Sequence, residues 1–476
     1  MYLGLDLGTS GLKGVVIDEA QNVVAQATAA LSVDRPNTGW SEQDPTSWIR
    51  AAEEVLDALA PKTLAGIRAI GLSGQMHGAT MLNSADEPLA PCILWNDTRS
   101  AAEAAEMDAD QDWRAISGNI VFPGFTAPKL AWQRAQSPAL FDQIAKVLLP
   151  KDYLRLWLTG EYASDMSDAA GTSWLDTGAR DWSDALLEKT HLSREHMPRL
   201  VEGSQLSGNL RPALAARFGM GEVPVAGGGG DNAASAVGLG VTEPGQGFVS
   251  LGTSGVLFAA TETYAPDAET AVHTFCHALP DMWHQMGVIL ACADALNWAA
   301  NLVSTDAAGL TGALGPLEAP SNALFLPYLG GERTPLNSAS IRGGWFGIDH
   351  GCDSTALART VLEGITFALT DCRDALRATG TRIDRLLATG GGTGSEYWLA
   401  ALATSLELPL ELPENSDIGA AFGAARLGMM SATGDTGLAT LPKIAKTIEP
   451  NQALVSSFRD AHSRYKAAAN TLKELS

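Results

Sequence analysis

The sequence predicts a mixed α/β protein built from two similar domains, and three observations support this fold class. The pentapeptide Leu7–Gly11 recurs letter for letter as Leu251–Gly255, about half a chain later. Strand-like apolar runs flank both copies, and the later segments alternate between strand and helix patterns. Hydrophobic residues make up 46% of the 476 residues and charged residues 18%, which suffices for sizeable cores and excludes a disordered or fibrous protein.

The charge composition excludes two classes of partner. Aspartate and glutamate outnumber lysine and arginine by 54 to 32, which gives a net charge of −22 at pH 7. Such a surface repels phosphate backbones and anionic membranes, and no run of basic residues offsets the repulsion. We therefore expect no nucleic-acid partner and no membrane association.

Three further features predict a soluble cytoplasmic protein. The most apolar stretch, Met286–Val303, carries an aspartate and two asparagines, so we expect a buried helix there and not a membrane span. The first apolar run contains Asp6 and has no basic leader, so no signal peptide is expected. The five cysteines form no C-x-x-C pair, which favours reduced thiols over disulfides or a zinc site.

In each copy of the repeat, a Gly-Thr-Ser-Gly turn joins two short apolar runs. These runs are Tyr2–Leu7 and Leu12–Ile17 in the first copy, and Phe248–Leu251 and Val256–Ala260 in the second. Because glycines supply the positive φ angles that tight turns need, each copy is expected to form a β-hairpin. The breaker cluster Glu243–Gly245 precedes the second hairpin, so we place the domains at residues 1–243 and 244–476.

Other segments continue the α/β pattern in chain order. Asp44 and Pro45 predict a helix start, and this helix runs to about Leu59. The segment Gly66–Leu72 follows as a strand. Asp353 begins a long amphipathic helix that ends at Gly380. The last predicted elements are the strand Arg385–Ala388, the loop Gly390–Gly394, the helix Glu396–Leu406 and the strand Leu408–Leu412.

The two glycine-hydroxyl turns could bind an anion, because they offer backbone N–H groups and short hydroxyls. Two such turns facing each other could clamp the phosphates of one nucleotide, although each alone is more often a plain turn. The loop Gly390–Gly394 lies between a strand and a helix and favours the nucleotide interpretation. No Walker-type loop occurs in the sequence, which excludes a P-loop ATPase.

Two aspartates are candidates for chemistry. Asp6 lies near the end of the first strand, where a carboxylate is costly unless it is paired or faces a ligand. It is either a water-mediated Mg²⁺ contact or a turn-stabilising residue. Asp231 follows the glycines Gly227–Gly230, which let the backbone approach another group closely. It suits a general base or an orienter of an attacking hydroxyl, and it could also be the N-cap of a helix over Ala233–Leu239; both roles could hold together.

His77 and Trp95 each allow both a structural and a ligand-binding interpretation. His77 follows another strand, and a lone histidine is more often structural than ligand-contacting. Trp95 precedes Asn96 and Asp97, a combination that suits the CH face and hydroxyls of a sugar but equally fits a core tryptophan near a turn.

Taken together, these segments resemble carbohydrate kinases of the FGGY type from Asp6 to about Ala425, nearly the whole chain. The motifs at Met76–Gly78 and Ser164–Thr172 are the more specific ones, whereas the hairpin and glycine motifs mark only the wider superfamily. The matching segments are Asp6–Gly11, Trp40–Pro45, Gly74–Thr80, Ile93–Asp97, Gly124–Lys129, Leu149–Tyr153, Ser164–Thr172, Gly228–Asn232, His273–Pro280, Phe325–Tyr328, Gly331–Pro335 and Ser395–Trp398.

The resemblance implies an α/β, two-domain, actin-like ATPase (ribonuclease-H-like) fold in which sugar and ATP meet in the interdomain cleft. It implies that Asp231 is the catalytic base and that Asp6 and Asp231 reach Mg²⁺ through water. The other implied site residues are Met76, His77, Trp95 and Asn232 at the sugar, Thr9, Ser10, Gly252, Thr253 and Ser254 at the phosphates, and Gly391 and Gly392 beside adenosine. Thr393–Gly394, Gly330 and Leu336 depart from the usual pattern of the family, which affects details of the nucleotide pocket only.

The implied reaction is transfer of the γ-phosphoryl group of ATP, with Mg²⁺, to position 5 of D-xylulose in the cytoplasm. A homodimer is compatible with it. One alternative is a kinase of the same family for ribulose, glycerol or gluconate. Others are a non-catalytic nucleotide-dependent sugar sensor, an actin-like scaffold, or a sugar binder without nucleotide. The intact Asp6, Asp231 and both hairpins favour a catalyst.

Overall fold

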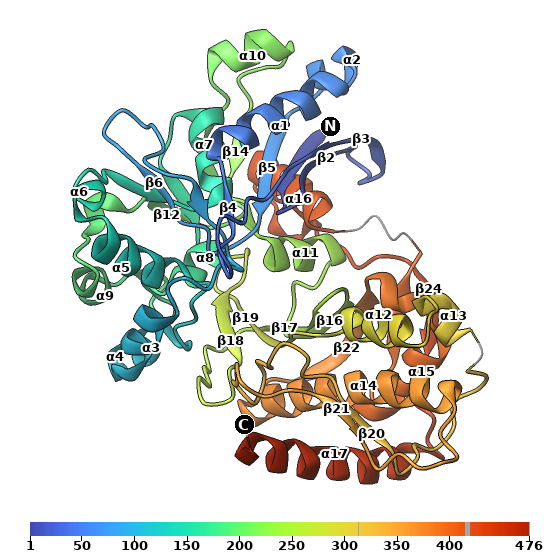
Figure 1. Ribbon diagram of the computed structural model, residues 1–476. Helices are drawn as coiled ribbons and strands as arrows, with labels where there is room; N and C mark the ends of the chain where they lie inside the picture. The colour runs from blue at the N-terminus through green and yellow to red at the C-terminus, as the bar shows by residue number, and fades with distance from the viewer. Residues whose placement is uncertain (313, 415–418, 476) are drawn as a thin grey trace.

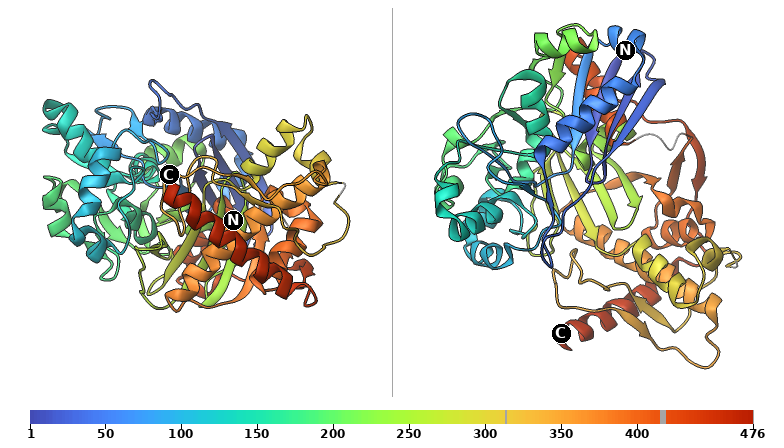
Figure 2. Two further views of the ribbon diagram at one scale, coloured as in Figure 1. Left: turned by 60° about the horizontal axis from the view of Figure 1, so that its bottom comes forward. Right: turned by 45° about the horizontal axis from the view of Figure 1, so that its top comes forward.

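Two seven-stranded sheets form the framework of the protein (Figure 1). The computed structural model describes residues 1–312, 314–414 and 419–475. The sheets lie in two lobes, each with helices packed on it, as the views of Figure 2 also show. Among the helices described, none has the length and apolar character needed to cross a membrane.

The first predicted hairpin is confirmed at the centre of the first sheet. Leu7 lies opposite Leu12 in an antiparallel pair, and the Gly8 N–H donates to the Gly11 carbonyl at 2.9 Å. The strand predicted over residues 66–72 is present but lies over Ala69–Gly74. The sheet order is β13 (Leu206–Asn209), β14 (Pro224–Ala226), β5 (Ala69–Gly74), β1 (Tyr2–Leu7), β2 (Gly11–Ile17) and β3 (Val23–Ala30), with β15 (Gly229–Gly230) also pairing with β5.

The second sheet repeats the arrangement of the first. Its hairpin has Leu251 opposite Gly255, and a strand parallel to the first hairpin strand lies beside it, as β5 lies beside β1. The duplicated sequence therefore predicts a real structural repeat. The sheet order is β18 (His273–Cys276), β19 (Trp283–Ile289), β17 (Gly255–Thr261), β16 (Gly245–Leu251), β22 (Ile383–Thr389), β23 (Leu410–Pro413) and β24 (Ile444–Ile448).

Three predicted helices are confirmed, and side-chain caps explain where two of them begin. The Asp44 carboxylate accepts from the backbone N–H of Thr46 at 2.9 Å and caps α1 (Pro45–Ala58). Asp353 accepts from the N–H of Ala356 at 2.8 Å and caps α14 (Ser354–Ala378). Such caps satisfy donors that the first helical turn leaves free. The helix α15 (Glu396–Leu406) has the predicted bounds.

One predicted helix is confirmed only in its second part. The segment Met286–Val303 contains the end of β19 and then α12 (Ala293–Leu302), which has a buried face as predicted. Met286 pairs with Phe258 of β17 on one side and with His273 of β18 on the other, so the apolar residues fill the middle of a sheet. A continuous apolar run does not by itself distinguish a buried strand from a buried helix.

The helix α16 (Ala420–Thr433) comes from the C-terminal half but packs on the first sheet and on α11 (Asp231–Leu239) (Figure 1). Glycines allow this close approach. A Cβ atom on Gly71 of β5 would lie 1.8 Å from a backbone oxygen of α16, and one on Gly423 would lie 1.7 Å from the Ala234 oxygen of α11. The chain therefore crosses to the first lobe at α16 and afterwards returns to the second sheet with β24.

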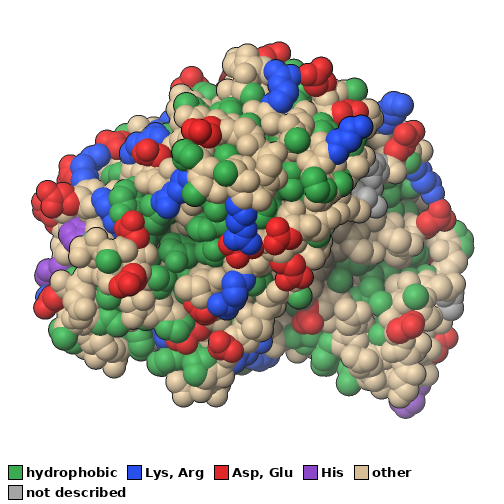
Figure 3. All heavy atoms as spheres, turned by 90° about the horizontal axis from the view of Figure 1, so that it is seen from above, with side chains coloured by type: hydrophobic (Ala, Val, Ile, Leu, Met, Phe, Trp, Pro, Cys, Tyr) green, Lys and Arg blue, Asp and Glu red, His purple; other side chains and the backbone are tan. Residues whose placement is uncertain are grey.

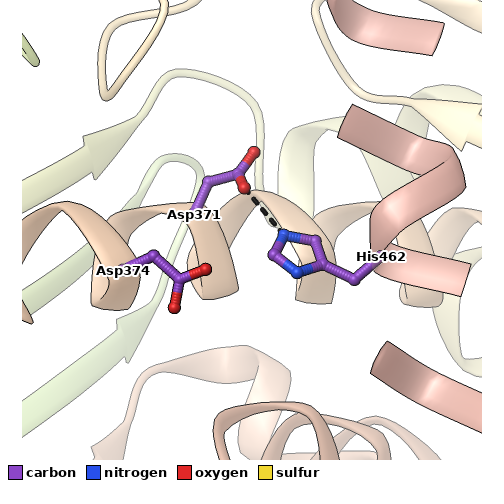
Figure 4. A group of neighbouring side chains, drawn as sticks. All are labelled: Asp371, Asp374 and His462. Atoms are coloured by element: carbon purple, nitrogen blue, oxygen red, sulfur yellow. Dashed lines mark hydrogen bonds and ion pairs between the residues drawn. The ribbon is translucent and has the colours of Figure 1, made fainter. Parts of the chain in front are cut away.

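The helix α17 (Val455–Leu475) packs against α14, where Asp371, Asp374 and His462 lie close together (Figure 4). The His462 Nε2 atom lies 2.7 Å from Asp371 Oδ1, whereas Asp374 is paired with the guanidinium of Arg373 at 2.6 Å. Because both carboxylates have protein partners, this group fastens α17 to α14 and does not point to a metal site.

The structure shows the burial of the cysteines and, on one face, the distribution of the charged side chains. Four of the five cysteines are buried, Cys352 is partly exposed, and all are free. On the face drawn in Figure 3, acidic and basic side chains are interspersed over the surface.

The remaining elements are short and mostly surround the first sheet. The strands are β4 (Glu42–Gln43), β6 (Thr80–Leu82), β7 (Cys92–Ile93), β8 (Lys146–Leu148), β9 (Ala163–Asp165), β10 (Leu175–Asp176), β11 (Asp181–Trp182), β12 (Arg199–Val201), β20 (Leu324–Leu326) and β21 (Gly344–Phe346). The α-helices are α2 (Pro61–Ala65), α3 (Ala101–Ala109), α4 (Gln111–Ser117), α5 (Thr126–Gln136), α6 (Pro138–Phe141), α7 (Pro150–Thr159), α8 (Met166–Ala169), α9 (Asp184–Lys189), α10 (Pro212–Phe218) and α13 (Ala307–Thr311). The 3₁₀ turns are η1 (Ala170–Thr172), η2 (Arg194–His196), η3 (Gly391–Gly394) and η4 (Thr436–Leu438).

Candidate active site

A cavity of about 320 Å³ is lined by residues from both halves of the chain. Most of the side chains predicted for the sugar and the second phosphate turn meet there. The predicted residues in its wall are Met76, His77, Trp95, Asp231, Asn232, Gly252, Thr253 and Ser254.

Asp231 reaches the cavity because the glycine loop continues the first sheet. Gly230 pairs with Gly74 of β5 and is the N-cap of α11, so Asp231 is the first helical residue and its expected alternative role as N-cap is wrong. Its Oδ1 accepts from the backbone N–H of Asn232 at 2.7 Å and from the Asn232 amide at 3.0 Å. Burial raises the pKa of Asp231 to about 6, and the charge of Asp6 adds to this shift. A carboxylate with this pKa suits a general base near neutral pH.

Asp6 lies in β1 between Lys13 of β2 and Ser73 of β5. Its Oδ1 atom is buried and has no hydrogen-bond partner in the part of the chain that the structure describes. Burial raises the pKa of Asp6, with opposing effects from Ser73 and Lys13. A turn-stabilising role leaves this oxygen unexplained, whereas a cation or its bound water would satisfy it.

The first hairpin turn does not line the cavity itself, but its Thr9 side chain is hydrogen-bonded to Trp95, which does. The Thr9 hydroxyl donates to Gln75 Oε1 at 2.9 Å and accepts from Trp95 Nε1 at 3.0 Å, and Ser10 is exposed outside the cavity wall. Trp95 is 45% exposed, so it is not a core tryptophan. The structure therefore does not bring Thr9 and Ser10 into the same wall as Thr253 and Ser254.

His77 has a fixed orientation and a fixed protonation state. Its Nδ1 lies 2.7 Å from the Gly171 carbonyl, and because a carbonyl only accepts, Nδ1 carries the hydrogen and Nε2 is an acceptor. Burial lowers the pKa of His77 to about 3, so the ring is neutral near pH 7. The ring stacks on Phe125 with centroids 4.5 Å apart. A neutral histidine of this kind can accept a hydrogen bond from a sugar hydroxyl.

The second hairpin adjoins two cavities. The side chains of Thr253 and Ser254 are exposed at the first cavity. Gly391 and Gly392 line a second cavity of about 550 Å³ together with residues of α12, α13 and α15. A Cβ atom on Gly392 would lie 2.7 Å from the Leu251 side chain, so this glycine loop packs directly on the hairpin. The arrangement suits a nucleotide with its phosphates at the turn and its adenosine beside the glycines.

Sequence reasoning missed several residues that line the first cavity from the C-terminal half, among them His273, Phe275 and Arg333. The Arg333 guanidinium lies 4.8 Å from the centre of the Phe122 ring and its NH1 lies 3.4 Å from His273 Nε2. In the described residues, Arg333 forms no ion pair with a carboxylate. The motif Gly331–Pro335 was the available signal, but only the folded loop shows that its arginine faces the cavity.

Comparisons with known proteins match this architecture. The N-terminal domain of the FGGY family of carbohydrate kinases matches residues 1–238, and the C-terminal domain of that family matches residues 247–432. The chain is 48% identical to a xylulose kinase of Escherichia coli over 445 residues, which are 93% of this chain and 92% of that protein.

Solved structures agree over the full length. A crystal structure of a xyloylose kinase from Brucella ovis has a TM-score of 0.99 at 58% identity and covers 100% of both chains. A gluconate kinase from Lactobacillus acidophilus has a TM-score of 0.92 at 25% identity, over 99% of this chain and 98% of that one. The fold is the two-domain actin-like ATPase fold, as the sequence predicted. The chain belongs to the FGGY family of carbohydrate kinases.

Proposed function

We propose that this kinase transfers the γ-phosphoryl group of ATP to the 5-hydroxyl of D-xylulose. The observation that carries the proposal is the Asp231 carboxylate, with a pKa of about 6, in one cavity with neutral His77 and the phosphate-type turn Gly252–Ser254. The relatives at 48% and 58% identity, named as xylulose and xyloylose kinases, support this sugar.

In the reaction, a bond forms between the sugar 5-oxygen and the γ-phosphorus while the bond from that phosphorus to the β–γ bridging oxygen breaks. ADP leaves with the electron pair of the broken bond. Because the transition state is loose, alignment and electrostatics supply most of the rate enhancement. Asp231 accepts the hydrogen bond of the 5-hydroxyl, directs its oxygen toward phosphorus and takes the proton late in the step.

Four side chains recognise the sugar in this proposal. His77 accepts a hydroxyl hydrogen at Nε2, and Asn232 offers its Oδ1 because its amide nitrogen is bonded to Asp231. The exposed ring of Trp95 covers a CH face, and Met76 supplies an apolar wall.

The nucleotide spans the two cavities. Thr253 and Ser254 contact its phosphates, and Gly391 and Gly392 contact adenosine. The turn residues Thr9 and Ser10 approach the phosphates from the opposite lobe when the domains close. Closure excludes water, which limits the hydrolysis of ATP without sugar.

Asp6 and Asp231 are the residues that would hold Mg²⁺, through water molecules. The buried, unpartnered Oδ1 of Asp6 and its electrostatic effect on Asp231 support this assignment. Bound Mg²⁺ would neutralise charge on the transferring phosphate.

The substrate is tested by measuring ADP release with Mg·ATP and a panel of D-xylulose, L-xylulose, D- and L-ribulose, glycerol and gluconate. We expect the highest kcat/KM for D-xylulose. A preference for another polyol would move the assignment to another kinase of the family. Sugar and nucleotide binding without ADP release on any member of the panel would favour a sensor.

The role of Asp231 is tested with Asp231→Asn, which keeps the side-chain shape but removes the base. We expect normal folding and a kcat about 10² to 10⁴ times lower, the range for a positioned acid–base group. Asp460→Asn, at an exposed position of α17, makes the same change in charge and is expected to leave kcat unchanged. Near-wild-type turnover of Asp231→Asn would disprove the assignment.

We also propose that the enzyme is a homodimer of the cytoplasm, with its domains divided near Glu243. The reduced state of all five thiols is compatible with that compartment. Light scattering coupled to gel filtration would test the assembly, with an expected mass of about twice that of one chain.

A further inference from the structure

Two sequence motifs, Leu149–Tyr153 and Ser164–Thr172, have no role in the mechanism described so far. Four charged side chains of these motifs, together with that of the nearby Arg155, form a cluster of five that has no exposed surface. The members of this buried charge cluster are Lys151, Asp152, Arg155, Asp165 and Asp168. Burial of so many charges is costly unless each has close partners, so the contacts of the cluster indicate what it does.

Lys151 lies at the centre of the buried charge cluster. Its Nζ lies 2.6 Å from Asp152 Oδ1, 2.7 Å from Asp165 Oδ1 and 3.1 Å from Asp168 Oδ2. Burial raises the pKa of Asp168 well above its usual range. Two cationic side chains, Lys151 and Arg155, thus lie among three carboxyl groups, and Lys151 contacts all three.

A chain of hydrogen bonds leads from the cluster to Asp231. Asp165 Oδ2 accepts from the backbone N–H of Ser167 at 2.9 Å and from the Ser167 hydroxyl. The Ser167 Oγ in turn accepts from the N–H of Gly230 at 3.1 Å. Because Gly230 directly precedes Asp231, Ser167 fixes the backbone from which the Asp231 side chain projects.

Arg155 fixes the other end of the glycine loop. Its guanidinium donates to the carbonyl of Ala226 at 2.6 Å and to that of Gly227. Between the two anchor points, Gly228 has a φ of +82°, a conformation that glycine adopts at little cost. The loop Gly227–Gly230 is therefore held at both ends. The pairing of β15 with β5 and the bonds from the Gly227 and Gly228 N–H groups to the carbonyls of Gln205 and Gly203 add to these anchors.

The same segment also orients the sugar site. Gly171, at the end of the Ser164–Thr172 motif, presents the carbonyl that binds Nδ1 of His77 at 2.7 Å. One short segment thus contacts both the backbone before Asp231 and the ring of His77.

We propose that the buried charge cluster is a positioning device for phosphoryl transfer, and that Ser167 is the positioning residue that transmits its geometry to Asp231. This inference rests on the proposed role of Asp231 as the base. Without the Ser167 hydroxyl, the Gly230 N–H loses its acceptor and Asp231 departs from its aligned position. A shift of about 1 Å at a reacting group can lower a rate by about 100-fold.

The test compares Ser167→Ala with Ser164→Ala in the full-length protein. Both serines are fully buried in the same segment, and Ser164 donates to Asp152 Oδ2 at 2.6 Å as Ser167 donates to Asp165. In contrast to Ser167, Ser164 makes no hydrogen bond to the glycine loop among the described residues. We expect similar losses of thermal stability, but a kcat about 10 to 100 times lower only for Ser167→Ala, with KM for D-xylulose changed less than about twofold.

Amide hydrogen exchange provides a second measurement that does not depend on the sugar. The peptide covering residues 227–232 should exchange faster in Ser167→Ala than in wild type or Ser164→Ala. Equal kcat in the two variants, or unchanged exchange of this peptide in Ser167→Ala, would overturn the proposal. If the wild type failed to phosphorylate D-xylulose, the proposed substrate would be wrong, and the exchange measurement alone would decide the positioning role.

Discussion

At the scale of single residues, the proposed role of Asp231 leads to a prediction for the pH dependence of the reaction. Its pKa of about 6 arises mainly from burial and secondly from the charge of Asp6, and the protonated form cannot accept the hydroxyl proton. We expect kcat/KM for D-xylulose to fall as pH decreases through about 6, since this parameter reports ionisations of the free enzyme.

The contribution of the Asp6 charge to the pH dependence of kcat/KM can be measured separately from that of burial. Asp6→Asn removes a like charge, which lowers the pKa of Asp231, so the acidic limb should move to lower pH even though overall activity falls. Burial still acts on Asp231, so a full return to the usual aspartate range is not expected. An acidic limb that stays in place or moves to higher pH would show that the two carboxylates do not interact.

Arg333 supports a second residue-scale prediction, on sugar affinity. Its guanidinium faces the cavity without a carboxylate partner among the described residues, so sugar oxygens can serve as its acceptors. We expect Arg333→Met to raise KM for D-xylulose by about tenfold or more, because a hydrogen bond to a charged group contributes about 1.5–3 kcal/mol. The control is Arg342→Met, which removes an exposed guanidinium bonded to carbonyls of its own turn. An unchanged KM for Arg333→Met would place the sugar elsewhere in the cavity.

Local patterns alone left the roles of Asp231 and His77 open, and the motifs of the family placed both residues at the site. The structure shows that both line the first cavity, and their roles stay predictions. Arg333 was missed because its role depends on a loop that folds onto Phe122, far away in the sequence. The hydroxyl of Thr9 was predicted to contact phosphate, yet it is bonded to Gln75 and Trp95, a pairing that no local pattern indicates.

At the scale of elements, local chemistry predicted the hairpins and the capped helices. Turn glycines and capping aspartates act within a few residues, so they are visible in the sequence. The error at the start of Met286–Val303 has the opposite cause. Its first residues became a strand because β17 and β18 lie on their two sides, which is a long-range property, whereas Ala293–Leu302 form a helix as predicted.

The contact between α16 and α11 supports an element-scale prediction on stability. A Cβ atom at Gly423 would lie 1.7 Å from the Ala234 oxygen, so Gly423→Ala must push the two helices apart. We expect a loss of about 1–3 kcal/mol in the free energy of unfolding, measured from the denaturant midpoint. Alanine is the better helix former by about 1 kcal/mol, so any net loss arises from the close approach.

A matched substitution at an open position provides the control. At Gly344, a Cβ atom would meet no other atom within 4 Å in the part of the chain that the structure describes. Gly344→Ala is therefore expected to change stability by less than about 0.5 kcal/mol. Equal stability of the two variants would mean that α16 and α11 can separate without cost.

At the scale of the whole molecule, the duplicated hairpin predicted two similarly built sheets, and the structure contains them. The return of α16 to the first lobe was not predicted, because its sequence resembles that of any apolar helix and its contacts with β1 and β5 span most of the chain. The division near Glu243 stays a prediction. Because α16 packs on the first sheet while β23 and β24 belong to the second, the chain passes between the lobes before β16 and again before and after α16.

Because residues of both halves line the first cavity, sugar and nucleotide should draw the lobes together. We expect the radius of gyration from small-angle scattering to decrease when D-xylulose and Mg·ATP are added to Asp231→Asn, in which slow turnover preserves the ternary complex. D-xylulose alone should produce part of the decrease in the wild type, since His77 and Arg333 line the cavity from opposite halves of the chain. Glycerol, which is smaller than a pentulose and offers fewer hydroxyls, is the control and should produce a smaller decrease. A radius that stays constant with both substrates would mean that the cavity is already closed, and the exclusion of water would then have to come from the fixed walls of the site.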